Sequence, residues 1–207
     1  MMWRATGIAA SMVLVACATM EDPAEDPIEG EATQALTGPT ILKTGTSTAR
    51  VLASSSTGPG LEIDGGKQLG SYLIAKYDGV RTSADVTADF TVTAETGAAF
   101  VYSLRGSGLG YSGKHLRVDR VPNSTTLRAG TPNGNVSCGT LPSNDATLVT
   151  IALATAAQRF DVLIDGAPTA CTDLPTGIVG PIFGFEMMDA SNDGYGGKVR
   201  FEGLAYP

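Results

Sequence analysis

From Gly38 onward, apolar residues recur in short runs separated by glycine, proline, asparagine and aspartate. In residues 86–93, apolar and polar residues alternate strictly, which is typical of a strand with one face in the core and one in solvent. Nine further runs are predicted to be strands: residues 49–53, 61–64, 72–77, 98–104, 116–121, 148–153, 160–164, 182–188 and 198–204. Residues 150–158 are the one segment where a short helix competes with a strand.

The turns between these runs indicate antiparallel pairing. Asp165-Gly166, between residues 160–164 and 167–171, is a strong signal for a two-residue hairpin. The composition includes 26 glycines and only 14 lysines and arginines, which also favours strands and turns over helices. We therefore predict an all-β fold, an antiparallel sandwich of two sheets.

Aromatic residues divide into two groups. Those that fall in the strand patterns are predicted to lie in the core: Phe90, Phe100, Tyr102, Phe160, Phe183, Phe185 and Phe201. Tyr111 and Tyr195 lie in glycine-rich loops and are the candidate ligand-binding residues, because exposed rings can stack on sugars.

The first 16 residues have the features of a signal peptide. One cation, Arg4, precedes an apolar run of residues 5–16, which is shorter than the ~20 residues that a membrane-spanning helix needs. The run ends in Leu14-Val15-Ala16-Cys17, which resembles the lipobox of bacterial lipoproteins. The resemblance implies cleavage after Ala16 and lipid anchoring through the thiol of Cys17. The alternative is an ordinary secreted protein in which Cys17 lies near the cleavage site by chance.

Residues 17–36 are predicted to be a lipidated, disordered tether. Residues 18–36 contain six acidic residues, two prolines and no base. The acidic side chains repel one another, and the segment has no periodic apolar face that could pack against a core. Ala18 occupies the position where an aspartate would signal retention, which favours the outer membrane of a bacterial envelope.

The remaining residues, 37–207, are predicted to form one β-sandwich domain. Without the six acids and Arg4, the chain has 13 basic and 15 acidic residues, so nothing indicates nucleic-acid binding.

Two cysteines remain if Cys17 carries lipid. Exported compartments permit oxidation, so we predict a disulfide between Cys138 and Cys171. Two free thiols are the alternative.

The order of segments resembles the concanavalin A-like, or laminin G-like, jelly-roll superfamily. Four stretches carry the resemblance: residues 88–92, 148–153, 160–166 and 199–204. The closing stretch has Glu202-Gly203 where Asp-Asn is more usual. The resemblance implies two curved antiparallel sheets and, because these are fold motifs, it implies no activity.

Three motifs in the sequence bear on catalysis. Glu62-Ile63-Asp64 is similar to part of the acidic cluster of jelly-roll glucanases, but glycines follow it and the second glutamate is absent. The glycines of residues 108–113 match a dinucleotide fingerprint in spacing only, since a strand follows them instead of a helix. His115, the only histidine, is predicted to be an exposed residue at a strand edge. No catalytic set emerges, and we predict a protein that is not an enzyme.

A calcium site is the one metal site that the sequence suggests. Residues 189–194 place the oxygen side chains of Asp189, Ser191 and Asp193 at alternate positions before a glycine, as in a calcium loop. The twelfth position is Arg200, where such a loop has a glutamate. The alternative is a polar turn in which these side chains bond their own backbone.

These features favour a non-catalytic envelope lipoprotein whose sandwich is a binding or adhesion module for carbohydrate or a surface protein. A glycan-active hydrolase of the jelly-roll type and a purely structural envelope component are the alternatives.

Overall fold

The computed structural model describes residues 39–55, 58–65, 72–108, 115–189 and 197–204. Every regular element in these ranges is a β-strand, as predicted, and all strand pairs are antiparallel. Within these ranges, no helix has the length and apolar character to cross a bilayer.

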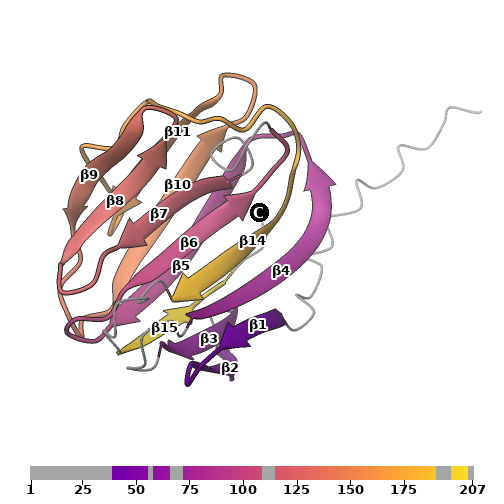
Figure 1. Cartoon of the computed structure of the whole chain (residues 1–207). Coiled ribbons are helices and arrows are strands. Elements are labelled where there is room, and N and C mark those ends of the chain that lie inside the picture. Colours follow the sequence, from indigo (N-terminus) through magenta and orange to yellow (C-terminus); the bar gives the residue numbers. More distant parts are fainter. Residues whose placement is uncertain (1–38, 56–57, 66–71, 109–114, 190–196, 205–207) are drawn as a thin grey trace, which may run out of the picture. The chain divides into compact units, whose positions relative to one another are not determined.

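The strands form two sheets, which are stacked with sheet A in front of sheet B in Figure 1. Sheet A contains, in spatial order, β1 (Thr40–Thr44), β4 (Tyr72–Thr82), β14 (Ile182–Asp189), β6 (Phe100–Arg105), β7 (His115–Arg120), β8 (Thr126–Thr131) and β9 (Gly134–Thr140). Sheet B contains β12 (Ala167–Pro168), β11 (Arg159–Ile164), β10 (Thr147–Ala154), β5 (Val86–Ala94), β15 (Lys198–Glu202), β3 (Gly58–Asp64) and β2 (Thr48–Ser55), and β13 (Leu174–Pro175) pairs with β11.

The core lies between the two sheets because strands such as β5, β10 and β15 present alternate apolar side chains to the other sheet. β5 shows the predicted alternation in its burial, with its apolar residues inside and its polar residues outside. Aromatic rings connect the layers: Phe90 of sheet B stacks on Tyr102 of sheet A, with ring centroids 4.1 Å apart. Tyr102 in turn stacks on Phe185, 5.7 Å away. Such ring pairs add to the stability that their burial provides.

All ten predicted strands are present. The competing helix at residues 150–158 is absent, because β10 continues to Ala154 and a turn follows it. Three longer strands were not predicted: β1, β8 and β9.

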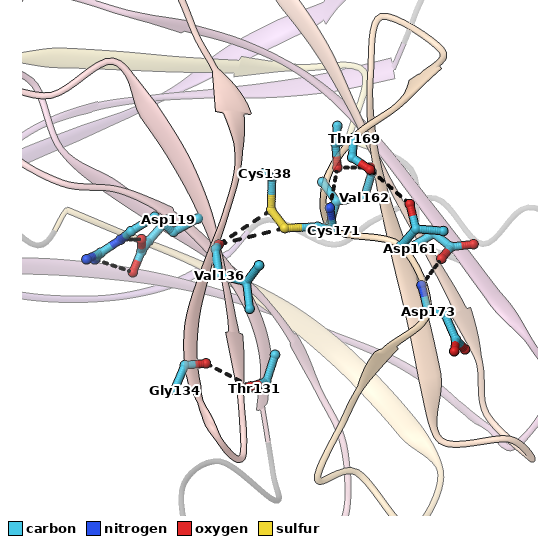
Figure 2. The surroundings of a disulfide bond; sticks show 12 residues. Asp119, Thr131, Gly134, Val136, Cys138, Asp161, Val162, Thr169, Cys171 and Asp173 are labelled. Carbon is cyan, nitrogen blue, oxygen red and sulfur yellow. Dashed lines mark hydrogen bonds and ion pairs between the residues drawn. A yellow bond between two sulfur atoms is a disulfide. The ribbon is translucent and has the colours of Figure 1, made fainter.

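The predicted disulfide between Cys138 and Cys171 is confirmed, with the two Cα atoms 4.9 Å apart. Cys138 lies on β9, the edge strand of sheet A. Figure 2 shows Cys138 bonded to Cys171. Cys171 follows β12, and its carbonyl accepts a hydrogen bond from the backbone N–H of Val162 on β11 in sheet B. The disulfide therefore links the two sheets along one edge of the sandwich.

Candidate functional site

The side of sheet A that faces away from the core is unusually polar. We call it the outer face of sheet A. It is formed by Ile74, Lys76, Asp78, Arg81, Val101, Ser103, Arg105, His115, Arg117, Asp119, Arg128, Asn135, Phe183, Glu186 and Met188. Several of its polar residues are nevertheless buried: Ser103 is 0% and Glu186 is 4% exposed. Buried polar side chains are costly unless they are paired or serve a function, so this face is the candidate site.

Four polar residues form a row across the middle of this face. Strand register places Lys76 of β4 beside Glu186 of β14, Glu186 beside Ser103 of β6, and Ser103 beside Arg117 of β7. Since neighbouring strands lie ~4.8 Å apart, the row spans roughly 14 Å. It offers both donors and acceptors in one line.

His115 and Glu186 meet over the strand between them. The Nδ1 atom of His115 lies 3.4 Å from Oε1 of Glu186, although β6 separates their strands. Ser103, a small residue on β6, leaves room for this contact. Its hydroxyl has no hydrogen-bond partner among the described residues. The site thus places a carboxylate, an imidazole and a buried hydroxyl close together.

The prediction of an exposed, strand-edge His115 is wrong. Its side chain is only 17% exposed. β7 lies inside sheet A rather than at its edge, because β8 and β9 extend the sheet beyond it. The β8–β9 hairpin, which the sequence did not predict, therefore explains why His115 lies inside the sheet and not at its edge.

Two arginines lie flat across glycines of neighbouring strands. A Cβ atom on Gly130 would come within 2.8 Å of the side chain of Arg117, which reaches across β8 and donates to Oδ1 of Asn135 at 3.1 Å. Likewise Gly184 lies between Arg105 and Asp78, which form an ion pair across it. The glycines keep these guanidinium groups close to the sheet.

Phe183 belongs to this face and not to the core, so its predicted position is wrong. A β-bulge between Ile182 and Gly184 interrupts the alternation of β14 and turns the ring outward, where it is partly exposed. The guanidinium carbons of Arg105 and Arg81 lie 5.0 and 5.7 Å from the ring centroid, within the range of cation–π contacts. The other six aromatic residues predicted for the core are buried.

The metal and ligand residues predicted from loops are only partly described. Cys17, Tyr111, Ser191, Asp193 and Tyr195 lie outside the described residues. Asp189 ends β14 on its inner side and is buried, with its carboxylate against the backbone of Gly65. In the described ranges, no group of three or more histidine, cysteine, aspartate or glutamate side chains could hold a metal ion. The calcium site stays a prediction.

The acidic pair of residues 62 and 64 is away from this site. Glu62 lies on the outward side of sheet B and forms an ion pair with Arg50 at 3.2 Å. Sequence reasoning missed Glu186 instead. The available signal was a single carboxylate inside the otherwise apolar run of residues 182–188.

Comparison with known proteins identifies the fold only. No family model and no curated protein matches this chain. A solved sialidase matches with a TM-score of 0.59 and 10% identity over 82% of this chain, which spans 18% of the sialidase's length. Cellulose induced protein Cip1 matches with a TM-score of 0.53 and 13% identity, over 83% of this chain and 86% of that one. A carbohydrate esterase from Shiga toxin-encoding bacteriophage phi24B matches with a TM-score of 0.52 and 12% identity, over 78% and 88% of the two chains. The chain thus contains a β-sandwich domain of the type found in these proteins.

Proposed function

We propose that this protein is an exported lipoprotein, anchored at Cys17, whose β-sandwich binds carbohydrate through the outer face of sheet A without altering it. The observation that carries the proposal is the row of Lys76, Glu186, Ser103 and Arg117. It combines hydrogen-bond donors and acceptors on the side of sheet A away from sheet B, with Lys76 and Arg117 partly exposed at its ends and Glu186 and Ser103 buried between them. Carbohydrate hydroxyls both donate and accept, so they match such a row, and the partly exposed ring of Phe183, on the same strand as Glu186, supplies an apolar contact beside it.

The names of the matched structures are consistent with this proposal. One is a sialidase, one is a carbohydrate esterase, and one is a cellulose induced protein. At 10–13% identity they carry no residue-level information about this chain. The proposal therefore rests on the outer face itself.

A glycan array is the direct test, with the full chain bearing Cys17→Ala to remove the lipid. We expect glycan binding that Glu186→Gln weakens at least about tenfold, which corresponds to about 1.4 kcal/mol. The matched control is Glu62→Gln, which makes the same change on the outward side of sheet B and should leave binding intact. Melting curves would establish that both variants are folded. Binding that depends on Glu62 and not on Glu186 would place the site on sheet B and contradict the proposal.

A glycan-active enzyme is the second candidate, and the contact between His115 and Glu186 is what favours it. Glycosidases generally need two carboxyl groups at a defined separation. The other described carboxylates of this face, Asp78 and Asp119, are each paired with an arginine. Mass spectrometry of the bound glycans would decide: products that disappear in Glu186→Gln would establish an enzyme.

The lipid anchor has its own test. Cells fed a labelled fatty acid should incorporate the label into the wild-type protein, which should be recovered with the membranes. Cys17→Ala should remove the label, because the thiol is the attachment point and durable anchoring requires acyl chains. Equal labelling of the two proteins would contradict lipidation at Cys17.

A further inference from the structure

The outer face of sheet A carries more positive than negative charge. Its described residues include five cations, Lys76, Arg81, Arg105, Arg117 and Arg128, and three carboxylates, Asp78, Asp119 and Glu186. With a neutral histidine, this leaves an excess of two positive charges. The chain as a whole has a net charge of −7, so the excess is a local feature of this face.

The opposite face of the sandwich differs. The outward residues of the described strands of sheet B include four cations and five carboxylates: Arg50, Arg159, Lys198, Arg200, Glu62, Asp64, Asp89, Asp161 and Glu202. Three cations of this face each have a carboxylate partner within 4 Å: Arg50, Arg159 and Arg200.

Among the described residues, three cations of the outer face of sheet A have no such partner. Arg105 pairs with Asp78, and Arg128 forms two hydrogen bonds with Asp119. In the described part of the chain, no carboxylate forms an ion pair with Lys76, Arg81 or Arg117. Within the described part of the chain, no ion pair neutralises these three positive charges, which can attract an anion.

The positions of these cations limit where anionic groups can bind. Lys76 and Arg117 stand at the two ends of the central row, with Glu186 and Ser103 between them. The carboxylate of Glu186 would repel an anion at the middle of the row. Arg117 uses one of its five N–H donors on Asn135, which leaves others for a carboxylate or a sulfate.

We infer that the ligand is an acidic oligosaccharide with at least two anionic groups, carboxylates or sulfates, one toward Lys76 and one toward Arg117. The inference rests on the proposed function and specifies its ligand class. The uncharged stretch of the ligand between the anionic groups lies over the middle of the row, where Glu186 and Ser103 are buried. Binding relies on charge, so it weakens as salt screens the attraction.

The test compares acidic glycans with neutral counterparts of the same backbone, using the full chain with Cys17→Ala. The panel contains oligogalacturonate and its methyl ester, and dextran sulfate and dextran. We expect the acidic members to bind at least tenfold more tightly than the neutral ones, and binding to weaken as sodium chloride rises from 50 to 500 mM. The two pairs also separate a carboxylate ligand from a sulfate ligand.

Single substitutions of the cations identify which side chains bind the acidic groups of the glycan. Lys76→Gln and Arg117→Gln should each weaken acidic binding about tenfold, whereas Arg200→Gln, on the opposite face, removes the same charge and should not. Neutral members that bind as tightly as acidic ones would overturn the acidic ligand and leave carbohydrate binding in place. A panel in which nothing binds, together with an array on which nothing binds, would overturn both.

Discussion

Replacing Arg120 with methionine is expected to lower the free energy of unfolding by about 3–5 kcal/mol, because several hydrogen bonds from a charged donor are lost and the apolar side chain offsets only part of that loss. Arg120 ends β7 on the inner side of sheet A, is 1% exposed and is among the largest fully buried side chains. Burial lowers the pKa of its guanidinium, because desolvation disfavours the charged form. Hydrogen bonds must offset this cost if Arg120 is to remain charged in the core.

Those hydrogen bonds hold three connections at one end of the sandwich. The Nε atom of Arg120 donates to the carbonyl of Ser124 at 2.6 Å, in the turn after β7. Nη1 donates to the carbonyl of Ala94 at 3.3 Å, at the end of β5 in sheet B, and Nη2 donates to the hydroxyl of Ser143 at 2.7 Å. Methionine fills similar space but removes the donor from the partly buried carbonyl of Ser124 and hydroxyl of Ser143, which is the expensive part of the change. The carbonyl of Ala94 keeps its hydrogen bond from the backbone N–H of Asn144.

Denaturant unfolding measures this effect, with two comparisons. Arg200→Met removes a half-exposed arginine on the outward side of sheet B and should change the free energy of unfolding by no more than about 0.5 kcal/mol. Arg120→Lys keeps the charge but loses the planar fork, so it should also be strongly destabilised. A midpoint for Arg120→Met close to that of the wild type would mean that the apolar side chain compensates fully for the lost hydrogen bonds.

Arg120 also illustrates what the sequence could and could not predict. Strict alternation located β5, and the same alternation in β7 places Leu116, Val118 and Arg120 on one side. A charged residue at an inward position is not interpretable until its partners are known, and two of them, Ala94 and Ser143, are more than 20 residues away in the sequence. β8 and β9 were missed because they form an edge hairpin with few apolar residues, of which Leu127 and Ala129 are buried.

The candidate site was missed for a related reason. Glu186, Ser103 and His115 are neighbours only because β14 inserts between β4 and β6, a strand order that local patterns do not specify. Phe183 was misplaced because the bulge in β14 shifts the alternation by one residue. Pairing of Cys138 with Cys171, by contrast, needed no geometry, because few cysteines were available.

Reducing that disulfide is expected to lower the free energy of unfolding by ~3–4 kcal/mol, since it closes a loop with a sequence separation of 33 residues. For a domain of this size the melting temperature should fall by roughly 6–16 °C. The loss should be concentrated at one edge, because β9 of sheet A and β11 of sheet B are joined there through Cys138 and Cys171.

Limited proteolysis and a double variant separate the cross-link from the packing of the sulfur atoms. Both cysteines are buried, so Cys138→Ala with Cys171→Ala adds a small packing loss to the loss of the cross-link. The double variant should therefore melt slightly below the reduced wild type, and reductant should not affect it further. Protease should cut reduced protein first in the β8–β9 hairpin, residues 126–140, because reduction removes the covalent tie of β9 to sheet B. The contrary result would be equal melting temperatures for the oxidised protein and for reduced protein in which both thiols are shown to be free. It would mean that packing alone holds this edge of the sandwich closed.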